Sequence, residues 1–142
     1  MKYTKIIGVD TGVNTGFAVW DAINKKFISI ETLPIHKAIL KIIDLRHENI
    51  FVRVEDARQR KWFGNAGKEV LQGVGSVKRD AIIWEEFLND YQIAFEMIHP
   101  IKGGTKLNSE TFKSITKWTG RTTSHSRDAA LMVFQFTKPN PF

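Results

Sequence analysis

A buried strand that ends on a carboxylate places the strongest constraint on how this chain can fold. The segment from Lys5 to Val9 is apolar enough for the centre of a sheet, yet it runs directly into Asp10. A glycine-containing turn follows, and then a second apolar strand from Gly16 to Trp20. Aspartate is rare in strands and costly to bury unless it is paired or bound to a cation. The rest of the sequence must therefore provide partners for Asp10.

The spacing of apolar residues predicts a mixed α/β order along the chain. Three strands, at about Thr4–Asp10, Gly16–Asp21 and Lys26–Leu33, are joined by turns short enough to make them antiparallel neighbours. The later elements are expected in this order: a helix after Pro34, a strand from Ile50 that ends on Glu55-Asp56, a long helix from Ala66 to about Asp90, a strand around Ile93–Met97, a short helix from about Ser109 to Trp118, and a last helix within Gly120–Phe136. Gly73 and Gly75 predict a kink or a break in the long helix.

This order, β-β-β-α-β-α-β-α-α, matches the ribonuclease-H-like fold, a five-stranded mixed sheet with helices on both faces. The 142 residues suit a single domain, residues 1–142, with a hydrophobic core of its own. There is no apolar run of membrane length and no signal-peptide pattern, and the chain has no cysteine, so disulfides and zinc–thiolate sites are excluded. These features predict a cytoplasmic protein with no membrane partner.

The chain is basic. Its net charge is +6 and its pI is about 9.7, which favours polyanionic partners, nucleic acid above all. Many soluble proteins are mildly basic for unrelated reasons, so the charge alone is a weak argument. If the partner is DNA, carboxylates near the binding surface would repel its phosphates, so the positions of the acidic residues matter.

Four residues from three distant segments are expected to meet at one edge of the sheet. In the predicted fold the first and fourth strands are parallel neighbours, which brings Asp10 and Glu55 to the same end of the sheet. The last helix adds His125 and Asp128, which lie on one helical face because they are three residues apart. Carboxylates gathered in this way repel one another unless a cation compensates. Mg²⁺ suits such a site, and two ions about 4 Å apart would serve phosphoryl displacement.

Small residues agree with this site, and each acidic residue also has a purely structural interpretation. Gly12 and Gly16 would let the backbone turn beside Asp10, and Ala129 and Ala130 would let the last helix lie close to the sheet. In the structural interpretation Asp10 forms a turn, Glu55 pairs with Arg53 or Arg58, Ser124 or Ser126 caps the last helix, and Asp128 complements its dipole. The combination of all three segments favours the metal site.

Five segments also match a known family in order: "IIGVDTGVNTGFAVWD", "VRVEDAR", "GVGSVKRDAIIWEEFL", "HPIKGGTKLNSETFKSITKWTG" and "SHSRDAALMVF". Together they resemble the RuvC-type Holliday-junction resolvases, especially the short forms carried by bacteriophages and prophages. The resemblance implies a homodimer that cuts four-way DNA junctions with Mg²⁺ or Mn²⁺ in a bacterial cell. It implies that Asp10, Glu55, His125 and Asp128 are catalytic and metal-binding. His125 stands where members have aspartate or histidine, and it would ligate metal or relay a proton.

A basic face is expected around the acidic site. Its predicted DNA-binding members are Arg58, Arg60, Lys61, Lys78, Arg79, Lys102 and Lys106. The resemblance carries the family's lysine onto Lys102, and Gly103 and Gly104 would allow a phosphate to approach the backbone. Lys25, Lys26 and Lys37 are expected to be ordinary solvated residues. The family's aromatic residue after the glutamate has no clear counterpart, and Trp62 and Phe63 are the nearest candidates.

Other interpretations stay open. A nuclease for other branched DNA or for RNA–DNA hybrids would use the same residues, and a non-catalytic module could bind structured DNA with the same fold. The turn after the first strand also resembles the phosphate loop of the actin, sugar-kinase and chaperone ATPases, but those need two such domains. Dimerisation is suggested by the apolar residues of the long helix, namely Val70, Val77, Ile82, Ile83, Trp84, Phe87 and Leu88.

Overall fold

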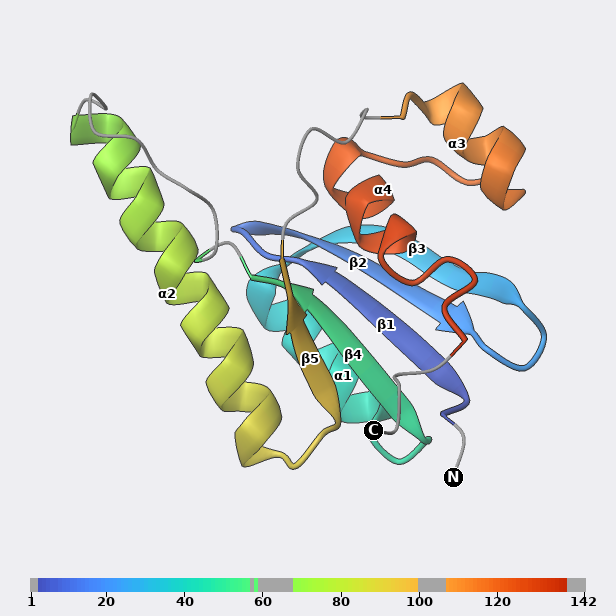
Figure 1. Cartoon of the computed structure of the whole chain (residues 1–142), viewed down its shortest axis with the longest axis horizontal. Helices are drawn as coiled ribbons and strands as arrows, with labels where there is room; N and C mark the ends of the chain where they lie inside the picture. Colours follow the sequence, from blue (N-terminus) through green and yellow to red (C-terminus); the bar gives the residue numbers. More distant parts are fainter. Residues whose placement is uncertain (1–2, 57, 59–67, 100–106, 138–142) are drawn as a thin grey trace.

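The computed structural model of the chain describes residues 3–56, 58, 68–99 and 107–137, without the side chains of residues 68–74 and 77. The elements are β1 (Lys5–Asp10), β2 (Asn14–Asp21), β3 (Lys26–Pro34), α1 (Ile35–Leu45), β4 (Ile50–Glu55), α2 (Lys68–Asp90), β5 (Phe95–Ile98), α3 (Ser109–Thr116) and α4 (Ser124–Leu131) (Figure 1). The predicted order of strands and helices is confirmed.

The strands form one five-stranded sheet in the order β3-β2-β1-β4-β5. The short links make β1, β2 and β3 antiparallel neighbours, and the helical connection through α1 returns β4 parallel to β1. β5 then pairs parallel with β4 at the edge of the sheet. The chain therefore has the predicted ribonuclease-H-like α/β fold, with β1 at the centre.

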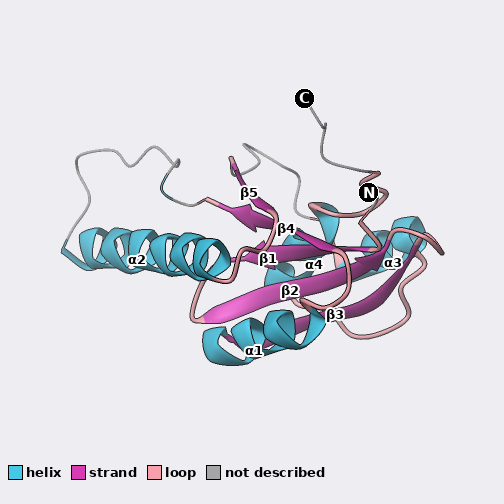
Figure 2. Cartoon of the chain, turned by 90° about the horizontal axis from the view of Figure 1, so that it is seen from below, coloured by secondary structure: helices cyan, strands magenta, loops and turns pink. Residues whose placement is uncertain are grey.

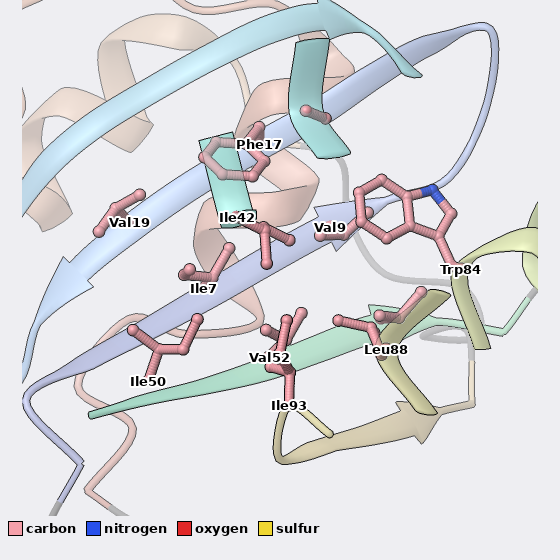
Figure 3. Packing of buried hydrophobic residues seen from close by; sticks show 12 residues of the cluster. Ile7, Val9, Phe17, Val19, Ile42, Ile50, Val52, Trp84, Leu88 and Ile93 are labelled. Carbon is pink, nitrogen blue, oxygen red and sulfur yellow. The ribbon is translucent and has the colours of Figure 1, made fainter. Parts of the chain in front are cut away.

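Side chains of alternate residues along β1 enter two separate cores. Ile7 and Val9 pack with residues of α1 and α2, such as Ile42 and Trp84, in the core drawn in Figure 3. Ile6 packs on the opposite face with residues of α3 and α4. Figure 2 shows α1 lying along one face of the sheet, and Figure 1 shows α4 on the other. The face of each β1 residue thus follows from its position in the alternation.

Two glycines allow α4 to lie directly on the sheet. A Cβ atom built on Gly8 would lie 2.1 Å from the carbonyl oxygen of Ala129, and one built on Gly16 would lie 2.1 Å from that of His125. Ala129 and Ala130 are fully buried, as the close packing of this helix requires. Gly16 was expected to serve the turn, and this expectation is wrong: it lies within β2, where it pairs with Asp10 and makes room for α4.

Two other expectations about local structure are wrong. α2 is continuous from Lys68, so Gly73 and Gly75 do not break it. A glycine costs a helix only about 1 kcal/mol relative to alanine, and packing of the buried Trp84 and Leu88 against the sheet offsets such a cost. α4 is capped by Thr123 rather than by Ser124 or Ser126.

Within the described ranges, none of the helices has the length and apolar character that crossing a membrane demands.

Candidate active site

Asp10 and Glu55 end two adjacent strands at the same edge of the sheet. The parallel register of β1 and β4 pairs Val9 with Val54, and each carboxylate is the next residue of its strand. Both residues are buried, with 6% of Asp10 and 8% of Glu55 exposed. The sequence predicted this juxtaposition from the strand order alone. Two acids held out of water side by side are costly unless positive charge compensates them.

Both carboxylates lie on the face of the sheet that α4 covers. In β1, Asp10 shares its face with Gly8, on which the backbone of α4 packs. In β4, Glu55 shares its face with Arg53, whose Nη1 donates to the carbonyl oxygen of Met132 just after α4. The alternation of strand residues therefore directs both acids towards the last helix.

His125 contacts Asp10. Its Nδ1 lies 3.2 Å from Oδ2 of Asp10, and its carbonyl oxygen lies over Gly16, the residue paired with Asp10 across the strands. The two side chains differ in accessibility, since 54% of the imidazole is exposed but only 9% of the carboxylate. The imidazole therefore connects a buried acid with solvent. Close packing of α4 on glycine fixes this contact.

Asp128 lies one turn after His125 on the same helix and is partly buried. Among the described residues, no three acidic or histidine side chains stand close enough together to hold a metal ion. The structure places Asp10 beside Glu55 at one edge of the sheet and His125 in contact with Asp10, with Asp128 one helical turn after His125, but it does not gather three of these side chains around one point. A metal site formed by all four remains a prediction.

Asp56, the residue after Glu55, binds Arg58 in a network that the sequence did not predict. Asp56 is buried, and its carboxylate accepts hydrogen bonds from Nε and Nη2 of Arg58 at 2.8 and 3.1 Å. Nη1 of Arg58 donates to Glu85 of α2 at 3.1 Å. The bonds to Asp56 and then to Glu85 raise the pKa of Arg58 above its ordinary value. Because Arg58 already joins α2 to the end of β4, a DNA phosphate would compete with two carboxylates for it.

A short-range signal for part of this network was present in the sequence. An aspartate two residues before an arginine can form an Asx-turn, and the backbone N–H of Arg58 donates to Oδ1 of Asp56 at 3.1 Å. Glu85 is 27 residues away from Arg58, so only the fold reveals it. Arg53, the other residue suggested as a partner for Glu55, donates instead to Glu96 of β5 at 2.6 Å.

The other residues predicted to bind DNA are only partly described. Lys78 and Arg79 are exposed on α2, and Nη2 of Arg79 donates to Ser76 at 3.3 Å. The remaining candidates lie outside the described residues: Arg60, Lys61, Lys102 and Lys106, together with the aromatic residues Trp62 and Phe63. A continuous basic face around the site therefore remains a prediction.

Comparison with known proteins supports the fold. No family model matches the chain, and no curated protein matches it in sequence. Among solved structures, the chain is similar to T. thermophilus RuvC in complex with a Holliday junction substrate, with a TM-score of 0.59 and 14% sequence identity. The match covers 94% of this chain and 92% of that chain. A likeness at this identity establishes the shared fold.

Proposed function

We propose that this chain is a metal-dependent endodeoxyribonuclease that cleaves four-way DNA junctions. The observation that carries the proposal is the pair of buried carboxylates, Asp10 and Glu55, on adjacent parallel strands, with His125 in contact with the first. The net charge of +6 suits a DNA substrate. The fold is also that of a protein solved with a Holliday junction. Kinship with phage and prophage forms and a place in the bacterial cytoplasm belong to the same proposal.

The donor set fits Mg²⁺ or Mn²⁺, the ions that the proposal requires. Mg²⁺ usually binds through only one or two protein carboxylates and keeps waters and substrate phosphates as its other ligands. Asp10 and Glu55 would meet this requirement for one ion, and Asp128 and His125 are the candidates to complete a second. When bound, such ions neutralise charge on the phosphodiester and on the leaving oxygen.

His125 has two alternative roles in this site, and its contact with Asp10 is compatible with both. When Nδ1 of the neutral imidazole carries the proton, it donates to Oδ2 of Asp10. Nε2 is then left as a proton acceptor on a side chain that is half exposed. His125 would thus orient Asp10 and accept a proton from the attacking water. The competing role, direct ligation of a metal through Nε2, would keep the hydrogen bond from Nδ1 to Asp10 but would leave no ring nitrogen to accept a proton.

The proposal includes a homodimer, because a four-way junction offers two symmetric strands to cut. On α2, Trp84 and Leu88 are fully buried in the chain's own core and are not available to a partner. Ile82 and Ile83 are 42% and 37% exposed. These two isoleucines are the described apolar residues of α2 on which a second copy could pack.

Substitution of Asp10 tests the proposal directly. Asp10→Asn keeps the shape of the side chain but removes its charge, so cleavage of a synthetic four-way junction in Mg²⁺ should fall below detection. Glu55→Gln should have the same effect. Asp44→Asn, at an exposed position of α1, is the matched control and should cleave normally. Undiminished cleavage by purified Asp10→Asn protein, with contaminating nuclease excluded, would refute the assignment.

A panel of substrates separates the competing functions. The purified protein is incubated with a four-way junction, a flap, a linear duplex, an RNA–DNA hybrid and ATP. Preference for the junction is the expected result. Preference for another branched DNA or for the hybrid would identify a related nuclease, binding without cleavage would identify a DNA-binding module, and hydrolysis of ATP alone would overturn the nuclease proposal.

A further inference from the structure

A pocket of about 720 Å³ lies towards the opposite end of the sheet from Asp10. Its walls come from the hairpin between β2 and β3, the end of α3, and the segment that follows α4. Along β2, Asp10 pairs with Gly16, whereas the pocket is lined by Trp20, four residues or about 13 Å further on. The pocket is therefore separate from the candidate active site.

Aromatic rings form much of this pocket. Trp20 and Phe27 are buried and meet edge to face, with ring centroids 4.9 Å apart. Phe134 stacks on Phe27 at 6.0 Å, and Trp118 meets the same ring edge to face at 6.5 Å. Trp118 and Phe134 are partly exposed, and Ile115 beside them is 47% exposed. The pocket thus offers apolar and aromatic surface to a flat ligand.

Three lysines also line the pocket, and none of them forms an ion pair with a carboxylate of a described residue. These lysines, Lys25, Lys26 and Lys117, are exposed. The nearby carboxylate of Asp21 is taken up by its own turn, where it accepts hydrogen bonds from Ile23 and Asn24. The pocket therefore combines aromatic surface with available positive charge.

The backbone around the pocket is held in an unusual conformation. Of the four non-glycine residues with positive φ in the described part of the chain, three line it: Lys25 at 56°, Lys117 at 66° and Gln135 at 56°. This region of φ favours glycine. Lys117 is the left-handed C-cap of α3 and Lys25 stands in the turn between β2 and β3, so at both positions the chain carries a long cationic side chain where glycine is more usual.

We propose that this pocket binds one nucleotide of an unpaired DNA strand, with its base against the aromatic rings and its phosphates beside the three lysines. Stacking on aromatic side chains and backbone contacts from lysines are how proteins hold single strands without sequence preference. A base inside a duplex could not enter a recess of this kind. The site is a second DNA contact and does not depend on cleavage at Asp10. Lys25 and Lys26 are then binding residues rather than ordinary solvated ones.

Binding of a fluorescein-labelled oligothymidylate of about ten nucleotides, followed by anisotropy in EDTA, tests the site without any cleavage. Single-strand binding constants fall with salt by a log–log slope of about −0.7 for each phosphate contact. Lys26→Gln and Lys117→Gln should each make this slope shallower by about 0.7 between about 50 and 200 mM salt. Lys37→Gln, exposed on α1 on the other side of the sheet, is the matched control and should leave the slope unchanged.

Several outcomes would overturn the site. In the salt titration, these are an unchanged slope in both folded pocket variants, or a change of slope in Lys37→Gln equal to theirs. In competition against labelled oligothymidylate, they are a hairpin duplex or polyglutamate that competes as strongly as an unlabelled single strand. Thermal melting of each variant identifies any loss of folding, and Lys26→Gln serves if Lys117→Gln does not fold. Junction cleavage is measured in parallel. Loss of single-strand binding with cleavage kept supports the pocket, and failure of the Asp10→Asn test affects only the nuclease.

Discussion

Gly8 shows how much one missing methyl group can determine in this molecule. Its Cα faces the backbone of α4, and a Cβ atom there would lie 2.1 Å from the carbonyl oxygen of Ala129. Backbone cannot move aside as the end of a flexible side chain can, so α4 would have to shift as a whole. The position of His125 over Asp10 therefore depends on a residue that has no side chain.

Gly8→Ala should lower the free energy of unfolding by about 1–3 kcal/mol, the usual cost of overpacking a core. Urea denaturation measures the change. Gly75→Ala is the contrasting variant, because no atom lies within 4 Å of a Cβ built there. In the interior of α2 it should instead stabilise the protein by about 0.5–1 kcal/mol. A loss of stability in Gly75→Ala, or none in Gly8→Ala, would contradict this account of the glycines.

Asp80 should make the stability of the protein depend on pH. It is buried on α2, and desolvation raises its pKa above the ordinary 3.8, although the charge of Arg79 opposes the shift. Because its pKa is higher in the folded chain than in the unfolded chain, ionisation of this carboxyl group costs more in the folded state. The free energy of unfolding therefore falls as the pH rises from the unfolded-state pKa to the folded-state pKa. Asp80→Asn should therefore be more stable than the wild type at pH 7.

Urea denaturation at several pH values checks the behaviour of Asp80. The gain from Asp80→Asn should shrink as the pH falls and vanish below about 3.8, where both folded and unfolded chains carry a protonated Asp80. Asp44→Asn removes the same charge from an exposed position and should show no such pH-dependent gain. A gain that is constant with pH would mean that desolvation of Asp80 is not its source.

Among the helices, α4 is the one whose start determines the candidate site. Oγ1 of Thr123 accepts a hydrogen bond from the backbone N–H of Ser126 at 3.1 Å, and Oγ of Ser126 accepts one from that of Thr123 at 2.8 Å. His125 lies between the two members of this capping box, in the first turn of the helix. Fraying of the first turn would move the imidazole away from Asp10.

Thr123→Ala should cost about 1 kcal/mol of stability, as loss of an N-cap usually does, and should also reduce junction cleavage. Asn108→Ala is the matched control. It removes the cap of α3, where Oδ1 accepts from the N–H of Thr111 at 2.8 Å, and should cost a similar amount of stability. Cleavage should stay near normal in Asn108→Ala once both proteins are assayed well below their melting temperatures. Equal cleavage by the two variants would show that the N-cap of α4 does not contribute to the candidate active site.

At the scale of elements, local signals in the sequence were strong and long-range ones were weak. Apolar alternation and short turns predicted the strands, and the parallel neighbours β1 and β4 placed Asp10 beside Glu55. Two ion pairs join residues far apart in the chain, Arg58 with Glu85 and Arg53 with Glu96. No local sequence pattern predicts pairs of this kind. The role of Gly16 was mistaken for the same reason, since only packing of α4 reveals it.

The whole molecule is predicted to act as a pair, and the exposed isoleucines of α2 provide the test. Light scattering of the wild type at micromolar concentration should give a dimer. Ile82→Asp places a charge on the expected interface and should give a monomer. Leu40→Asp, at a residue of α1 that is 56% exposed, should remain dimeric. A monomeric wild type would remove the dimer from the proposal.

At the same scale, the sequence could not reveal the lysine-lined pocket. Lys25 lies far along the chain from Lys117 and Gln135, and the feature that all three share is a backbone angle that neither composition nor spacing displays. Charge counting predicted a basic protein but not that Lys25, Lys26 and Lys117 line one pocket. The fold supplies that information by bringing the hairpin of β2 and β3 to the end of α3.

The placement of His125 on α4 also has a consequence for the order in which a ribosome delivers the parts. Strands β1 and β4 are complete once residue 55 has been made, but α4 starts only at Ser124. A growing chain therefore possesses both strand-end acids long before the helix that closes over them exists. Under the proposed function, a nascent chain would therefore lack His125 and Asp128, and with them half of the candidate active site, until α4 has been made.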